Sequence, residues 1–129
     1  MTVLIAGGGI GGLTLALSLH QIGVSVRVFE SVPQLKPLGV GINVLPHAVR
    51  ELIELGLLDQ LGAAGVRTRE LAYFSKHGQP IWSEPRGLEA GYKWPQFSIH
   101  RGTLQQLLLD TALEWLGREN ILTSYHLTG

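Results

Sequence analysis

The sequence contains no cysteine among its 129 residues. Without thiols the chain can form no disulfide, no cysteine-ligated iron–sulfur cluster and no thiolate zinc site. This lack fits the reducing cytoplasm, where we expect the protein to act. We also expect no metal site, because the five histidines form no H-x-x-x-H pair and no cluster with carboxylates; they are His20, His47, His77, His100 and His126.

The chain also lacks a surplus of either charge. Ten basic residues balance ten acidic ones, so nothing attracts the chain to nucleic acid, and we expect no nucleic-acid partner. No apolar run reaches the ~18 residues of a membrane span, and no basic segment precedes the first apolar run. We therefore expect neither a membrane span nor a signal peptide. With 45% hydrophobic and 16% charged residues, the sequence predicts a folded domain with a real core.

Glycine, by contrast, is concentrated near the N-terminus, where it fills five of the six positions in 7–12. The apolar run TVLIA at 2–6 precedes these glycines and is typical of a parallel strand buried on both faces. A helical pattern follows from Ile10 to about Gln21, and VSVRVFE at 24–30 alternates like a second strand. Together these segments predict one βαβ unit of about 30 residues.

The glycines fit the pattern G-x-G-x-x-G at Gly7, Gly9 and Gly12, in the strand-to-helix context that this motif requires. The first glycine permits a tight turn, the second lets a pyrophosphate approach the backbone, and the third lets the helix lie against the strand. Gly11 removes one more side chain beside the phosphates. Glu30 ends the second strand and can accept hydrogen bonds from a ribose. We therefore predict dinucleotide binding; the alternative is that the glycines serve only close packing.

The middle of the chain departs from a simple βαβ repeat. The proline- and glycine-rich segment 31–46 predicts a shaped loop, and Pro46 suits the first turn of a helix. The further expected elements are a helix over 46–55, a short helix near 57–62, a hairpin of strands 69–75 and 79–84, a loop over 85–95, a strand over 96–100, a helix over 101–117 and a third core strand over 120–127. In the helix over 101–117 we expect one side to carry Leu104, Leu107, Leu108, Thr111 and Trp115.

The insertion after Glu30 bears on which dinucleotide is bound. A nicotinamide dehydrogenase usually continues here into another crossover helix and a parallel strand, whereas a longer cofactor needs more protein around it. The pattern therefore favours FAD over NAD. Two alternatives stay open: the Rossmann half of an NAD-dependent dehydrogenase, and a non-catalytic dinucleotide-binding module.

Three blocks of the sequence resemble the single-component FAD-dependent aromatic-ring monooxygenases, the family of the salicylate and p-hydroxybenzoate hydroxylases. The blocks are LIAGGGIGGLTLALSLHQIGVSVRVFE, PLGVGINVLPHAVRELIELGL and SIHRGTLQQLLL. The chain is most similar to the phenazine-pathway branch, the 5-methylphenazine-1-carboxylate monooxygenases. The resemblance implies an enzyme that hydroxylates a small aromatic compound, with bound FAD, O2, and NADH or NADPH as a transient reductant.

The resemblance also implies a set of cofactor-binding residues. The FAD pyrophosphate would lie along Gly7, Gly9, Ile10, Gly11 and Gly12, while Glu30 would hold the adenosine ribose. Val40 and Gly41 would lie near the ribityl or flavin end, and Arg101 would meet the cofactor through its planar guanidinium. A cation at the start of a helix is electrostatically disfavoured, so a nearby anion would explain Arg101. No catalytic side chain is predicted.

The expected fold is α/β: a Rossmann-like, three-layer FAD/NAD(P)-binding fold with a β-hairpin insertion. Members of the family are much longer than this chain, so we expect residues 1–129 to be the N-terminal part of one FAD-binding domain. Within it we expect a βαβ core over 2–30, an insertion over 31–95, and a helix and core strand over 101–127. The rest of the FAD domain and a substrate domain would lie outside this chain, which alone would be inactive. A homo-oligomer is compatible with the sequence.

Overall fold

A computed structural model describes residues 1–129, and the chain divides into two compact units. The first unit combines residues Met1–Val40 with Arg101–Gly129, and the second consists of Gly41–His100. Each unit has its own hydrogen-bonded strands and its own buried side chains.

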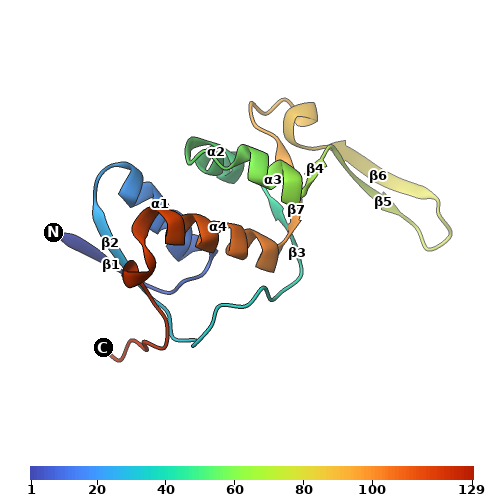
Figure 1. Cartoon of the computed structure of the whole chain (residues 1–129). Coiled ribbons are helices and arrows are strands. Elements are labelled where there is room, and N and C mark those ends of the chain that lie inside the picture. Colours follow the sequence, from blue (N-terminus) through green and yellow to red (C-terminus); the bar gives the residue numbers. More distant parts are fainter. The chain divides into compact units, whose positions relative to one another are not determined.

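The first unit contains a parallel sheet with strand order β1-β2-β8. Its strands are β1 (Thr2–Ala6), β2 (Ser25–Phe29) and β8 (Ile121–Leu122). The first two strands, β1 and β2, are drawn in blue near the N-terminus in Figure 1. β1 pairs with β2 from Thr2 opposite Ser25 to Ala6 opposite Phe29, so the two strands end at the same edge. The predicted strands over 2–6 and 24–30 are thereby confirmed, and the segments that follow them meet at that edge.

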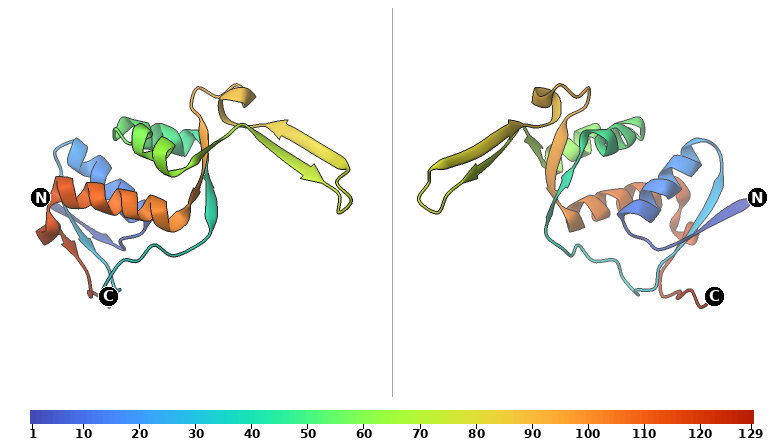
Figure 2. Two further views of the ribbon diagram at one scale, coloured as in Figure 1. Left: turned by 45° about the vertical axis from the view of Figure 1, so that its right-hand side comes forward. Right: turned by 180° about the vertical axis from the view of Figure 1, so that it is seen from behind.

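Two helices, α1 (Ile10–Gln21) and α4 (Arg101–Leu116), lie side by side on the same side of these strands (Figure 2). Both helices are confirmed, but the buried face of α4 differs from the predicted one. Its buried residues are Gly102, Leu104, Gln105, Leu108, Ala112 and Leu116. Leu107, Thr111 and Trp115 are only half-buried. A polar side chain, Gln105, thus belongs to the buried face, which the apolar pattern alone did not reveal.

The predicted position of the third strand of this sheet is confirmed, but its predicted length is wrong. We expected it over 120–127, but β8 ends at Leu122. Ser124 has a φ of 62°, a left-handed conformation that an extended strand cannot contain. The chain beyond β8 still follows β2, because the N–H of Tyr125 donates to the carbonyl of Glu30 (2.9 Å).

The second unit contains an antiparallel sheet with strand order β3-β7-β4, against which α2 and α3 pack. Its elements are β3 (Gly41–Val44), α2 (Pro46–Glu54), α3 (Leu58–Ala64), β4 (Val66–Thr68), a 3-10 turn (Gly87–Ala90) and β7 (Gln96–His100). The helices and β7 were predicted, and Pro46 does open α2. The predicted loop over 31–46 is wrong from Gly41 onward, because that segment pairs with β7 as β3.

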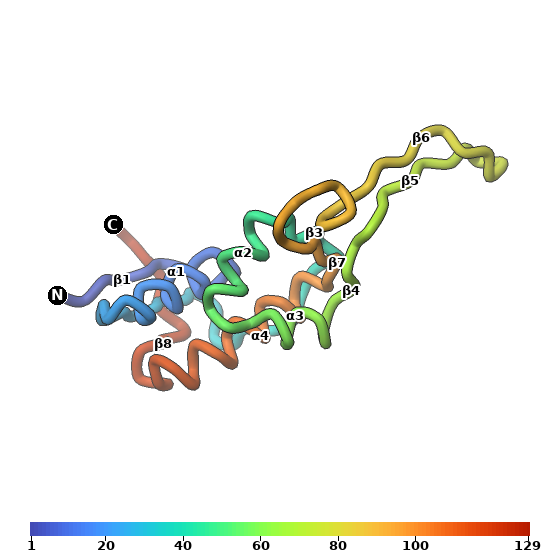
Figure 3. The backbone as a smooth tube through the Cα atoms, turned by 90° about the horizontal axis from the view of Figure 1, so that it is seen from above, coloured from blue at the N-terminus to red at the C-terminus, as the bar shows by residue number.

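A separate two-stranded hairpin joins β5 (Glu70–Phe74) to β6 (Pro80–Pro85), as the sequence predicts (Figure 3). The α/β class is confirmed, and the first unit supplies one helical layer and the sheet of the predicted three-layer fold. None of the helices has both the length and the apolar character needed to cross a bilayer.

Candidate dinucleotide site

The glycine-rich segment forms the turn between β1 and α1. Gly7 has a φ of +108°, a conformation that favours glycine, and its N–H donates to the carbonyl of Phe29 (2.7 Å). Gly12 lies so close to this turn that a β-carbon built on it would be 2.0 Å from the carbonyl oxygen of Gly7. Both positions therefore need glycine for reasons internal to the protein, which is what the motif predicts for its first and third glycines.

Gly9 and Gly11 differ from these two, because a β-carbon built on either would have no atom within 4 Å other than those of its chain neighbours and of its own helix. Gly9 has an extended backbone that any residue can adopt (φ −76°, ψ −177°). Gly11 lies in the first turn of α1, where glycine is less favourable than alanine by about 1 kcal/mol. Neither packing nor backbone conformation explains these glycines, whereas a ligand that approaches the backbone does.

The electrostatics of this helix start suit an anion. No side chain caps the N-terminus of α1, and its first turn contains no acidic residue. The backbone N–H groups of a first turn have no partners within the helix, and the helix dipole places positive charge there. An open, uncapped helix N-terminus with side chains removed at Gly9 and Gly11 is the arrangement that binds phosphate groups. The residues present therefore fit a pyrophosphate.

Gly8 is also constrained, although the motif leaves its position free. It is buried, and a β-carbon there would lie 3.2 Å from Leu35 Cδ1 and 3.3 Å from Glu30 Oε2. Its N–H donates to Glu30 Oε2 (2.7 Å), and its carbonyl accepts a hydrogen bond from Gln105 Nε2 (3.1 Å). The sequence pattern did not predict a role for Gly8 or Gln105; the one signal for Gln105 was a polar residue among the leucines of its helix.

Glu30 is held by several hydrogen bonds at the end of β2. Besides the bond from Gly8, its Oε1 accepts from the N–H of Val32 (3.1 Å) and from Ser31 Oγ (3.2 Å). The bond from Val32 is the main reason that the pKa of Glu30 lies below its ordinary value; burial opposes this shift and the bond from Gly8 adds to it. The carboxylate of Glu30 is only half-buried, so it can also accept a hydrogen bond from a hydroxyl group of a ligand.

The segment 31–40 lies against the start of α4. The N–H of Arg101 donates to the carbonyl of Val40 (2.9 Å), and a β-carbon on Gly102 would lie 2.5 Å from the carbonyl carbon of Pro37. Gly39 has a φ of +122°, and a β-carbon there would lie 3.3 Å from Arg101 Cβ. The structure thus brings together Val40 and Arg101, both exposed.

Gly41, the last of the predicted site residues, opens β3 of the second unit, where it pairs with His100. The other predicted residues, namely Gly7, Gly9, Ile10, Gly11, Gly12, Glu30, Val40 and Arg101, belong to the first unit.

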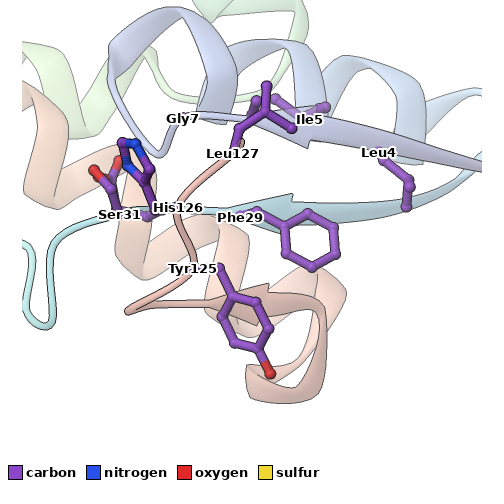
Figure 4. A pocket seen from close by; sticks show the side chains of 10 residues that line it. Leu4, Ile5, Gly7, Phe29, Ser31, Tyr125, His126 and Leu127 are labelled. Carbon is purple, nitrogen blue, oxygen red and sulfur yellow. The ribbon is translucent and has the colours of Figure 1, made fainter. Parts of the chain in front are cut away.

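A cavity of about 590 Å³ opens where β1 and β2 end (Figure 4). Its apolar wall includes Phe29 and Tyr125, whose rings make an edge-to-face contact with centroids 5.6 Å apart. Gly7, Glu30 and Ser31 also line it. Ligands of parallel α/β sheets bind outside the carboxyl ends of the strands, and this cavity has the size of a small-molecule site.

The fold and the glycine turn together define an α/β protein of the dinucleotide-binding class. A family model described as "FAD binding domain" matches residues 1–114. The chain belongs to this FAD binding domain family, and FAD is therefore confirmed as the predicted cofactor.

The sequence is 52% identical over 122 residues to phenazine 1,6-dicarboxylic acid hydroxylase PhzS of Lysobacter antibioticus, which covers 94% of this chain and 30% of that protein. The predicted similarity to flavin-dependent aromatic hydroxylases, and to their phenazine branch, is thereby confirmed.

Solved protein structures also resemble this chain in fold. Klebsiella pneumoniae HpxO, as the R204Q variant complexed with FAD, matches with a TM-score of 0.80 and 26% identity over 100% of this chain and 32% of that one. The tetrameric form of 2-methyl-3-hydroxypyridine-5-carboxylic acid oxygenase matches with a TM-score of 0.79 and 28% identity over 95% of this chain and 31% of that one. The chain thus spans about a third of the length of the proteins it matches.

Proposed function

We propose that the first unit binds the ADP half of FAD, with the pyrophosphate along Gly7, Gly9, Ile10, Gly11 and Gly12. The observation that carries this proposal is the open space at Gly9 and Gly11 beside an uncapped helix start. The missing side chain costs helix stability at Gly11, and packing gives no reason for glycine at either position. An anion that contacts the backbone gives that reason.

Glu30 accepts a hydrogen bond from the adenosine ribose, because its half-buried carboxylate lines the cavity and its hydrogen bonds within the protein hold it in place. The adenosine then occupies the cavity that Glu30 lines. Its apolar wall, with the rings of Phe29 and Tyr125, suits a flat base. The low pKa of Glu30 keeps this carboxylate ionised at neutral pH and so available as an acceptor.

Val40, Gly41 and Arg101 serve the ribityl or flavin end of the cofactor. The guanidinium of Arg101 offers a planar set of donors to phosphate or ribityl oxygens, and it is exposed and free to reach them. Its position at the positive end of α4 is unfavourable for a cation unless an anion lies near.

The protein, at its natural length, is a flavin-dependent monooxygenase. Bound FAD supplies the redox chemistry: NADH or NADPH, O2 and a proton are consumed, one oxygen atom enters an aromatic C–H bond, and the second leaves as water. Residues 1–129 form part of its FAD-binding domain, with the core over 2–30, the insertion over 31–95 and the segment 101–127, and act together with a substrate domain. A cytoplasmic location and a homo-oligomeric state belong to the same proposal.

Oxygen consumption of the purified, FAD-loaded protein at its natural length tests this activity. With phenazine-1,6-dicarboxylic acid, or another aromatic acid from a small panel, we expect stimulated NAD(P)H oxidation and a product heavier by one oxygen atom. The Gly9→Val variant should lack both. Flavin-bound protein that hydroxylates no member of the panel would leave FAD binding standing and contradict the hydroxylase assignment.

A further inference from the structure

The peptide groups on both sides of Gly8 are each held by one side chain. The N–H of the Gly7–Gly8 peptide donates to Glu30 Oε2 (2.7 Å), and the carbonyl of the Gly8–Gly9 peptide accepts from Gln105 Nε2 (3.1 Å). These partners lie 22 and 97 residues away along the chain, at the end of β2 and on α4. Gln105 is buried, and its side-chain amide donates to this carbonyl from the buried face of α4.

The geometry of the peptide bond links this contact to the phosphate site. A trans peptide is planar, so its N–H points opposite to its C=O. The bond from Gln105 therefore fixes the N–H of Gly9, in the same peptide, on the side facing away from α4. Glycines have the widest backbone freedom of all residues, and a row of them needs an external constraint to hold one orientation.

We infer that Gln105 is a positioning residue for the phosphate site: it holds the Gly8–Gly9 peptide so that the N–H of Gly9 is presented to the pyrophosphate before the cofactor arrives. This inference rests on the proposed binding of FAD along the glycine turn. Preorganised donors bind an anion more tightly, because the loop need not be ordered when the ligand binds. The role belongs to the buried face of α4, which otherwise consists of apolar or small residues.

Replacement of Gln105 tests the inference in the protein at its natural length. Gln105→Met keeps the side-chain length and removes the donor, and we expect the Kd for FAD to rise about tenfold. The matched control is Gln106→Met on the same helix, since Gln106 is half-buried and bonds only to Asp110 one turn away (2.8 Å). This control should bind FAD like the wild type.

Gln105→Glu separates positioning from packing. The introduced carboxylate cannot donate to the carbonyl of Gly8 at high pH, whereas its protonated form can. Burial and the negative charge of Glu30 raise its pKa. The elements around the loop carry few other titratable or charged groups. They are His20 on α1, Arg27 on β2, Lys36 in the segment 31–40, and Arg101, Asp110 and Glu114 on α4, while β1 has none.

We therefore expect the FAD affinity of Gln105→Glu to recover toward the wild-type value as the pH is lowered and the introduced carboxyl group becomes protonated, while the wild type changes less over the same range. The amide resonance of Gly9 should shift in Gln105→Met and recover with pH in Gln105→Glu, even without FAD.

Each outcome decides one claim. Wild-type affinity in Gln105→Met, or an unshifted amide resonance of Gly9 in that variant, would overturn the positioning role of Gln105. Wild-type protein that binds no FAD would instead overturn the proposed function.

Discussion

The five glycines of the turn have separate physical tasks. Gly7 supplies a left-handed backbone, Gly12 permits the approach of α1 to the turn, and Gly9 and Gly11 leave open space. Gly8 fits beneath Leu35 and Glu30. The motif predicts the tasks of Gly7, Gly9 and Gly12 because they follow from local geometry. It could not predict the task of Gly8, which depends on side chains from distant parts of the chain.

The pH dependence of stability is a consequence of Glu30. Its pKa is lower in the folded protein than in the unfolded chain, so the ionised form stabilises the fold at neutral pH, and this contribution is lost as the pH falls through the folded-state pKa. When the pH is lowered below about 4.3, the ordinary pKa of glutamate, we expect the free energy of unfolding to decrease. In Glu30→Gln this part of the pH dependence should vanish.

Urea unfolding at pH 7 and at about pH 3.5 gives the free energy of unfolding of the wild type and of Glu30→Gln at each pH. A Glu30→Gln variant whose stability falls with pH as steeply as that of the wild type would show that other carboxyl groups are responsible.

Among the elements, the segment 31–40 depends most on its partner. Its prolines and glycines predict a loop, but not where the loop lies. The structure shows that Gly102, the second residue of α4, leaves space for the backbone of Pro37 and Leu38. The strands β3 and β4 were missed for a similar reason: both are short, and both pair with β7, which lies far along the chain. Pairing of this kind leaves little local pattern.

Gly102→Ala tests the contact between this loop and α4. Helix propensity alone would make the substitution stabilising. The β-carbon of the introduced alanine, however, would lie 2.5 Å from the backbone of Pro37, so steric conflict should dominate. We expect a loss of about 1–3 kcal/mol in the free energy of unfolding. Hydrogen exchange of residues 33–40 should become faster.

Gly62→Ala in α3 is the matched control, because nothing lies within 4 Å of a β-carbon there. It should stabilise the protein by about 0.5–1 kcal/mol. The interpretation of the loop contact is wrong if Gly102→Ala stabilises the protein as Gly62→Ala does.

At the scale of the whole molecule, the βαβ unit was predictable because its periodicity, its glycine turn and its terminal acid are all local in sequence. The division into two units was not, since the first unit is assembled from two segments that a third separates. The same holds for the cavity at the end of the sheet, whose residues come from β1, β2 and the segment after β8. The choice of FAD over NAD came chiefly from family resemblance, which the family match confirms.

Titration of the protein with FAD, followed by the flavin fluorescence, tests the central claim most directly when wild type and Gly9→Val are compared. The wild type should bind one FAD, with ADP as a competitor. Gly9→Val should unfold at nearly the same urea concentration, since a β-carbon there meets no atom beyond its chain neighbours, yet its Kd for FAD should rise by about a hundredfold or more. Equal affinity of the two proteins for FAD would contradict the assignment of the glycine turn to the cofactor's phosphates.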